Sequence, residues 1–224
     1  MTDADRGAAD RTGADTAGAA PATTAHPTAL ESVDDIEWAV RLLADTPTHE
    51  GRDPELLRRW ARAADEFGSR LAPLPCAARI VERDDGLGQG LLARYTSRPP
   101  TVELYTDTLA LAERVVDDRG WRAWYPPGSV RAAALAHESV HVHLHHGPAR
   151  AGLKRALGHT ALRLGRLRVP GHVVGAEEIA AHAHARTVCG LGRSPLLLTA
   201  ALAEAVAAPG TGPDRRPRPA RREN

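Results

Sequence analysis

Residues 133–147 read AALAHESVHVHLHHG and hold five histidines. Within them, His137, Glu138 and His141 form the arrangement HExxH. Residues four positions apart lie on the same face of a helix, so both imidazoles can reach one metal ion while Glu138 lies beside that ion without having to bind it. Zinc held by three protein ligands keeps a position for water and lowers the pKa of that water, which a neighbouring carboxylate can deprotonate. The stretch therefore predicts a metal site suited to hydrolysis.

A second acidic segment, GAEEIAAHAHARTVCG, follows at residues 175–190 and contains the pattern ExxAHxxA, which starts at Glu178. Its small residues would let this segment, as a helix, approach the metal helix closely. We expect Glu178 to supply the third metal ligand, with Glu177 as the competing candidate. His182 lies one turn after Glu178 and is expected to orient a ligand or to contact the substrate.

An oxyanion stabiliser is also expected, because attack on a carbonyl builds negative charge on its oxygen. Residue type alone offers four candidates. The alternative for each of them is that its side chain is packed in the core or faces solvent and takes no part in the site. The candidates are His182, His184, Tyr105 and Tyr125.

The remaining histidines of the stretch alternate off the face that carries HExxH, so we expect them to lie on the surface or behind the ligands. These are His143 and His145, and His146 lies near the expected helix end. The alternative is a second metal site that uses His143, or His145 with a histidine of residues 175–190.

The histidines need a rigid element to position them. No glycine or proline interrupts the chain between Ser129 and His146, which predicts a long helix. Amphipathic periodicity predicts a first helix with Ser32 as its cap and a second that begins with Pro54 after Asp53. These two helices are expected at about 31–46 and 54–71, and further helices at about 107–118, 149–167, 175–189 and 195–208.

Three short segments between these helices alternate partly between apolar and polar residues. They are CAARIVER (76–83), GLLARYT (90–96) and TVELYT (101–106), separated by DDGLGQG and SRPP. Short alternating segments separated by loops rich in glycine, proline and polar residues are typical of a small antiparallel sheet.

The composition places these elements in one domain. The chain has 224 residues, 42% of them hydrophobic and 4% aromatic, which allows an ordinary core that relies on Leu, Ala and Val. Residues 1–29 and 209–224 have little to bury and are expected to be disordered, so residues 30–208 form the expected single domain. A formal charge of +1 argues against a protein built mainly to bind nucleic acid.

Two further features bear on the partners and the compartment. Cys76 and Cys189 form no CxxC pair, and the longest apolar run, residues 196–208, is too short to span a bilayer. We therefore expect a cytoplasmic protein without a membrane partner. The basic stretch 149–168 has no acidic residue and is interpreted as a solvated helix face, with a patch for phosphate or an acidic partner as the alternative.

At this point the chain resembles a known group. HESVH followed by EIAAHAHA resembles the gluzincin type of zinc peptidase, and the order of helices, short sheet, metal helix and glutamate helix is most similar to ImmA/IrrE-type metallopeptidases over roughly residues 75–190. The resemblance implies zinc bound by His137, His141 and Glu178, with Glu138 as general base, and a protein or peptide substrate. It also implies that an edge strand near the metal aligns the substrate. TVELYT is the candidate strand, and the alternative is that it is a buried strand of the sheet.

The expected fold is therefore α+β and mostly α, with a small antiparallel sheet of about three strands packed against the HExxH helix and the following glutamate-bearing helix. The leading hypothesis is a zinc metallo-endopeptidase. A second hypothesis is a metal-stabilised regulatory or protein-binding module that cleaves nothing, because His182 stands where the family usually has Asp or Asn. A third, iron or manganese in a helical carboxylate site, ranks last because the doubled Glu-x-x-His set expected there is missing from the sequence.

Overall fold

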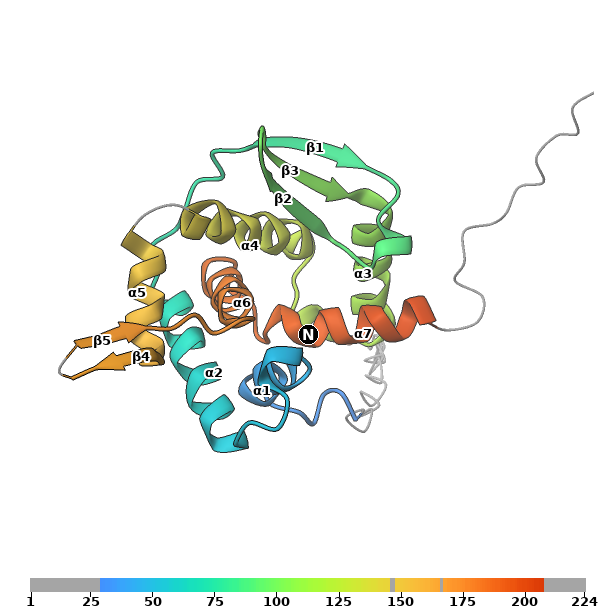
Figure 1. Cartoon of the computed structure of the whole chain (residues 1–224). Coiled ribbons are helices and arrows are strands. Elements are labelled where there is room, and N and C mark those ends of the chain that lie inside the picture. Colours follow the sequence, from blue (N-terminus) through green and yellow to red (C-terminus); the bar gives the residue numbers. More distant parts are fainter. Residues whose placement is uncertain (1–28, 146–147, 166, 208–224) are drawn as a thin grey trace, which may run out of the picture.

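The computed structural model describes residues 29–145, 148–165 and 167–207. Apart from Ala29, the two terminal segments expected to be disordered lie outside these residues, as does His146. The fold is α+β and mostly helical, with one small three-stranded sheet and one two-stranded sheet (Figure 1). The helices are α1 (Asp35–Ala44), α2 (Pro54–Ser69), α3 (Thr106–Asp118), α4 (Ser129–His145), α5 (Pro148–Leu157), α6 (Ala176–Val188) and α7 (Pro195–Ala207).

The first two helices begin where short polar side chains satisfy free backbone amides. Asp53 accepts a hydrogen bond from the amide of Glu55 at the start of α2, as the Asp-Pro sequence predicts. At α1 the expected cap was wrong. Asp34 rather than Ser32 caps this helix by accepting from the amide of Glu37 at 2.8 Å. The hydroxyl of Ser32 instead donates to the carbonyl of Ala29.

The three-stranded sheet is mixed rather than antiparallel. Strand β3 (Pro100–Tyr105) lies in the middle, antiparallel to β2 (Ala93–Ser97) and parallel to β1 (Arg79–Arg83). The prediction failed for β1 because residues 84–92 do not form a tight turn. They carry the chain past β3, through a short 3-10 turn, before β2 begins. The sheet lies over α4, and β2 is the edge strand beside this helix (Figure 1).

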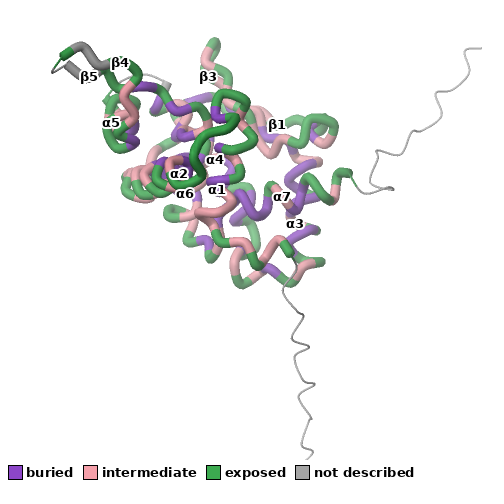
Figure 2. Tube along the Cα trace, turned by 60° about the horizontal axis from the view of Figure 1, so that its bottom comes forward, coloured by how far each residue is buried: buried purple, intermediate pink, exposed green. Residues whose placement is uncertain are grey.

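A hairpin replaces the second half of one expected helix. Helix α5 ends at Leu157 rather than at about 167, because Gly158 takes a left-handed conformation with φ of +61°, a common way to end a helix. Strands β4 (Thr160–Leu164) and β5 (Leu167–Pro170) follow and pair antiparallel. Figure 2 shows them at the edge of the molecule, so much of the basic stretch lies in a peripheral hairpin.

The buried side chains form two clusters that share α4. We call the first the sheet-side cluster. It joins β3, α3 and α7 with the first half of α4, and includes Val102, Leu104, Leu109, Val116, Val130, Ala133, Ala134, Leu197, Leu198 and Leu202. We call the second the helix-side cluster. It joins α1, α2, α5 and α6 with the second half of α4, and includes Val40, Leu43, Leu57, Trp60, Ala64, Val140, Leu144, Leu153, Ile179, Ala180 and Ala181.

The most apolar segment of the sequence forms α7, which packs against α3, α1 and α6. Its buried residues include Leu197, Leu198 and Leu202. Among the described residues, no helix combines the length and the apolar character needed to cross a lipid bilayer. Both cysteines, Cys76 and Cys189, are free thiols.

Candidate metal centre

The two histidines of HExxH lie one turn apart on α4, at the junction of the two buried clusters. Their Nε2 atoms are 3.0 Å apart and their ring centroids 4.9 Å apart. The side chains of His137 and His141 are only 15% and 19% exposed. The helical spacing of the sequence therefore brings two imidazole nitrogens to one point, as a shared ligand site requires.

Glu178 reaches the same point from the first turn of α6. Its Oε2 atom lies 3.2 Å from Nε2 of His137, and its Oε1 atom lies 3.3 Å from Nε2 of His141. In a tetrahedral zinc site with bonds of about 2.0–2.1 Å, neighbouring ligand atoms are about 3.3 Å apart. The three side chains thus have the donor atoms and the spacing of metal ligands. The competing candidate, Glu177, is directed to Nε of Arg150 at 3.6 Å instead.

His182, one turn after Glu178, completes a wider group of metal-binding side chains. Its ring centroid lies 4.4 Å from that of His137. His137, Glu178 and His182 each present a ligand atom within 4.8 Å of the others, so this group could hold a metal ion. Among the described residues, Nδ1 of His137 and Nδ1 of His182 are buried without a hydrogen-bond partner. A metal-binding histidine usually donates this N–H to a carboxylate or a carbonyl, and in the described residues neither group accepts from Nδ1 of His137.

The charges of the group are strongly coupled. Although the side chain of Glu178 is 48% exposed, loss of water around it pushes its pKa upward. Hydrogen bonds and charges from His137 and His141 outweigh that effect and hold the pKa of Glu178 well below its usual value. Burial lowers the pKa of His141, but the interaction with Glu178 outweighs burial and raises it overall. For His182, burial and then the charge of His137 lower the pKa well below the usual value.

Glu138 is buried beside the two histidines of α4. It is 7% exposed and, with His137, Glu178 and His182, lines a cavity of about 150 Å³. A carboxylate beside the metal ligands and open to a cavity can accept a proton from water held there. The rest of the wall is formed by Gly90, Leu91, Leu92, Ala93, Tyr125, Val130, Ala133, Ala134, Leu191, Pro195, Leu198, Thr199 and Leu202.

Three residues singled out for the site lie elsewhere or face away from it. Tyr105 is fully buried at the end of β3, and its hydroxyl lies 3.3 Å from the carboxylate of Glu103. His184 is 1% exposed and lies beside the backbone of Gly68 and Leu71, where burial lowers its pKa. Tyr125 lines the cavity, but its hydroxyl donates to the carbonyl of Ser194 at 2.7 Å. His182 is therefore the only one of the four oxyanion candidates whose ring adjoins the described ligands.

Of the histidines after HExxH, His143 is exposed on α4 and does not belong to the group. The side chain of His145 and all of His146 lie outside the described residues. The group of three or more potential metal ligands found in the described part of the chain is the one around His137.

The strand that faces the site is not the expected one. TVELYT forms the central strand β3, hydrogen-bonded on both sides, so it has no edge to offer a peptide. Edge strand β2 and the residues before it lie beside α4 instead, and residues 90–93 line the cavity. Nothing in the local sequence distinguishes an edge strand from a central one, because strand order depends on the crossover at residues 84–92.

Comparisons with models of protein families, with curated proteins and with solved structures found no match to this chain. The likeness to ImmA/IrrE-type metallopeptidases therefore stays a prediction from the residues of the two motifs. The convergence of His137, His141 and Glu178 is independent of that likeness, since it is a geometric property of this structure.

Proposed function

We propose that this protein is a zinc-dependent peptidase that hydrolyses a peptide bond with metal-activated water. The observation that carries the proposal is the meeting of two imidazole nitrogens of α4 and a carboxylate of α6 at distances of 3.0–3.3 Å, beside Glu138. When bound by three protein ligands, zinc supplies a Lewis acid that brings the pKa of a coordinated water towards 7. This donor set of two imidazoles and one carboxylate suits zinc.

Each residue then has a separate task. His137, His141 and Glu178 hold the ion on two helices that are packed against each other, which fixes its position relative to Glu138. Glu138 takes a proton from water as general base and returns it to the leaving amine. His182 lines the same cavity and can donate a hydrogen bond to the oxygen on which charge develops.

The substrate side of the proposal is a peptide held in extended form. Strand β2 is an edge of the sheet and lies next to α4, so an extended chain added to this edge would run past the metal ligands. A cytoplasmic protein is the proposed substrate, consistent with two free cysteines in the chain.

The decisive experiment is Glu138→Gln in protein loaded with one equivalent of zinc. We expect zinc binding to persist, because Glu138 is not a ligand, and hydrolysis of a peptide mixture to fall by about 10²–10⁴-fold. The matched control is Glu177→Gln, which removes a carboxylate from α6 that is directed to Arg150. Unchanged hydrolysis in Glu138→Gln, with zinc still bound, would exclude this mechanism.

A second function deserves a test because of His182. If its ring joined His137, His141 and Glu178 as a ligand, four protein groups would saturate a tetrahedral ion, as in structural zinc sites. The protein would then be a metal-stabilised regulatory or protein-binding module. On this reading His182→Ala weakens zinc binding by about 10²-fold or more. Zinc-loaded wild-type protein, added to a cell extract, then produces no new peptide termini. On the peptidase reading the variant keeps its three zinc ligands.

A further inference from the structure

One stretch of the chain combines positive charge with exposed apolar side chains. Residues 139–176 contain six of the 29 basic residues and none of the 28 acidic residues, although the whole chain has a net charge of only +1. Six large apolar side chains are exposed among the described residues, and three of them lie in this stretch, namely Leu162, Val169 and Val174. Such a charge asymmetry in a nearly neutral chain indicates a surface for an anionic partner.

The hairpin of this stretch presents an apolar face to solvent. Strands β4 and β5 lie beside α5 at the edge of the molecule (Figure 1, Figure 2). Leu162 of β4 is paired directly with Val169 of β5, so their side chains lie on the same face of the hairpin. They are 51% and 40% exposed. The pair can therefore bury apolar area against a partner.

Helix α5 adds positive charge that the protein itself does not neutralise. Arg155 is exposed and Lys154 is partly exposed. Arg150 lies 3.6 Å from a carboxylate oxygen of Glu177, whereas Lys154 and Arg155 form no ion pair with a carboxylate of the described residues. These two cations are therefore available to a partner that carries carboxylates.

The base of the hairpin is held firmly on the body of the molecule. The ring of His159, just before β4, packs edge-on against the buried Trp60 of α2, with the ring centroids 5.1 Å apart. The amide of Gly171, just after β5, donates to the carbonyl of His159 at 2.7 Å, and a Cβ atom at Gly171 would lie 2.3 Å from Cδ2 of the His159 ring. Helix α2 also packs on α6, so the hairpin has a defined position relative to Glu178.

The backbone of the hairpin favours a polypeptide as the partner. Within the described residues β4 and β5 pair only with each other, which leaves N–H and C=O groups free along both outer edges. The bulge of β4 and Pro170 lie near the base, and the strand pairs beyond them are regular. An extended chain can pair with such an edge. Residues 139–176 contain no Phe, Tyr or Trp, on which the bases of single-stranded nucleic acid would stack.

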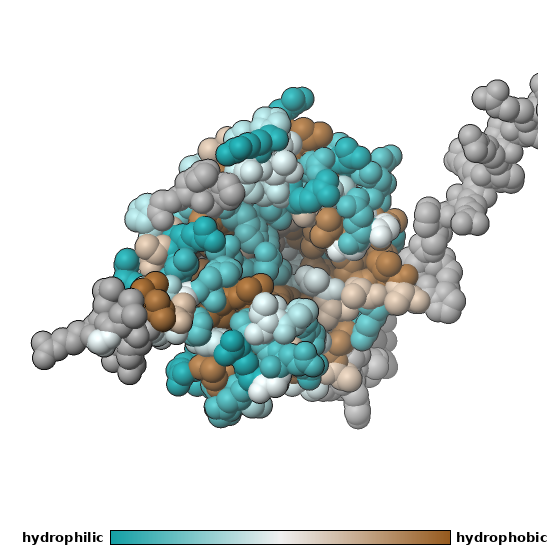
Figure 3. Space-filling view, in the orientation of Figure 1, coloured by the Kyte–Doolittle hydropathy of each residue, from teal (hydrophilic) through white to brown (hydrophobic). Residues whose placement is uncertain are grey.

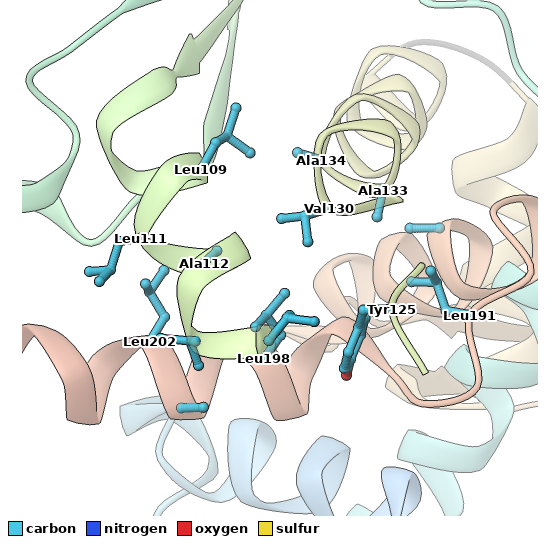
Figure 4. Close-up of a cluster of buried hydrophobic side chains, with 14 of the residues drawn as sticks. Leu109, Leu111, Ala112, Tyr125, Val130, Ala133, Ala134, Leu191, Leu198 and Leu202 are labelled. Carbon is cyan, nitrogen blue, oxygen red and sulfur yellow. The ribbon is translucent and has the colours of Figure 1, made fainter. Parts of the chain in front are cut away.

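A second cavity connects the metal ligands with the hairpin. The first cavity lies between α4 and α7 (Figure 4), and in Figure 3 hydrophobic residues border a hollow in that region. Glu178 lines both cavities. The wall of the second one also contains His172, Val174 and Gly175, from the segment that leads from β5 to α6, and residues at the end of α1. An extended chain that passes the metal ligands can therefore continue past Glu178 towards β5.

We propose that α5 and the hairpin of β4 and β5 form a docking surface for an acidic, extended segment of the protein substrate, away from the bond that is cut. The inference rests on the proposed peptidase function, since it names the substrate class. Asp45 and Glu177 line the second cavity and would repel carboxylates. The acidic segment of the substrate therefore begins beyond that cavity, where the cations of α5 and the apolar pair Leu162 and Val169 can contact it.

Binding is tested with a fluorescein-labelled peptide in which Glu and Val alternate, added to zinc-loaded Glu138→Gln protein. Fluorescence anisotropy should show tighter binding of this peptide than of one in which Lys and Val alternate, by about tenfold or more, and the affinity should fall as salt is added. Arg155→Glu should weaken binding about fivefold, because it reverses an exposed charge. Leu162→Thr should also weaken it about fivefold, because apolar contact area is lost while the β propensity is kept.

Arg114→Glu is the matched control, because Arg114 is exposed on α3 and the same charge reversal there lies away from the hairpin (Figure 1). It should leave the affinity for the Glu-Val peptide unchanged. Equal binding of the Glu-Val and Lys-Val peptides, or equal losses in Arg155→Glu and Arg114→Glu, would overturn the docking surface. Tighter binding of phosphatidylserine vesicles or of duplex DNA than of the Glu-Val peptide would also overturn it, because the surface would then serve another class of partner.

A cleavage measurement separates this proposal from the peptidase function. The Glu-Val segment is attached through a flexible Gly-Ser linker to either end of a peptide that the wild-type protein cuts. At one of the two ends it should lower KM about fivefold or more and leave kcat unchanged, and Arg155→Glu should remove this advantage. Binding of the Glu-Val peptide without cleavage of any peptide would support the docking surface and remove the peptidase function. Cleavage that ignores the acidic segment at both ends, with no binding of the Glu-Val peptide, would overturn the docking surface and leave the peptidase function intact.

Discussion

The two walls that flank the metal ligands are packed in opposite ways. On the helix side, α2 and α6 are so close that a Cβ atom added to Gly68 would lie 2.1 Å from the carbonyl oxygen of Ala180. On the sheet side, α4 and α7 leave a cavity of about 150 Å³. The same helix, α4, takes part in both. The tightly packed helix side therefore holds Glu178 in a fixed position, and the loosely packed sheet side leaves an open space beside Glu138.

Ion pairs reinforce the tight wall. Arg186, near the end of α6, contacts Asp35 of α1 and Asp65 of α2, with both distances at 3.0 Å. The side chains of all three residues are mostly buried, so water screens these pairs less than it would at the surface. Helix α6 is therefore tied to two neighbours in addition to its close contact with α2, and Glu178 is carried on a helix with little freedom to shift.

The largest effect should come from placing the same new side chain in each wall. Ala180→Leu forces three additional carbon atoms into the contact between α2 and α6, and we expect it to cost about 3 kcal/mol or more of unfolding free energy. Ala134→Leu points into the cavity and should change stability by less than about 1.5 kcal/mol in either direction. Urea unfolding of the two variants, both with zinc removed, measures the difference. Equal costs would mean that the cavity is already filled or collapsed in solution.

A smaller substitution, Gly68→Ala, tests the close contact between α2 and α6 more specifically. Gly68→Ala adds one methyl group that must push α2 away from the backbone of Ala180, and we expect a loss of about 1–3 kcal/mol together with weaker zinc binding, because α6 carries Glu178. Gly88→Ala is the control, since a Cβ atom there meets nothing within 4 Å and Gly88 does not have a positive φ. If Gly68→Ala loses stability but keeps full zinc affinity, the position of Glu178 does not depend on this contact.

The parts of this design that rest on local spacing could be predicted from the sequence. His137 and His141 meet because a helix repeats every 3.6 residues, whatever lies around it. Helix α4 needed only a stretch free of glycine and proline, and α2 needed only the Asp53-Pro54 start. The choice of Glu178 over Glu177 also followed from helical spacing, because Glu178 and His182 lie on one face of α6.

The parts that depend on distant segments could not be predicted. The neighbour of β1 is decided by a crossover at residues 84–92, and its sequence is equally compatible with a hairpin loop. Tyr105 has the right chemistry for an active site, but sequence alone does not show that its hydroxyl contacts Glu103. The cavity is formed by segments around residues 91, 125, 134 and 198, each of which reads as ordinary core. A cavity that forms between several helices and strands cannot be recognised in the sequence of any single one of them.

The smallest effect concerns the loop that closes the loose wall. The carboxylate of Asp107, at the start of α3, accepts hydrogen bonds from the amides of Gly86, Leu87 and Thr108 at 3.1, 3.0 and 2.8 Å. Burial pushes the pKa of Asp107 upward, but these bonds outweigh it and the pKa lies below its usual value. They fix residues 86 and 87, just before the segment at residues 90–93 that lines the cavity.

Asp107→Asn should therefore cost about 1 kcal/mol at pH 7, because the amide keeps one acceptor oxygen but loses the charge. A carboxyl whose pKa is lowered by folding stabilises the folded state above its unfolded pKa of about 3.9, and this contribution disappears as the pH falls through the lowered folded pKa. The gap between the unfolding free energies of wild type and Asp107→Asn should thus be constant from pH 7 to 5 and shrink below about pH 4. Asp84→Asn, an exposed carboxylate of the same loop, should show no comparable gap at pH 7. A gap for Asp107→Asn that stays the same at low pH would show that the charge of Asp107 does not hold this edge of the cavity in place.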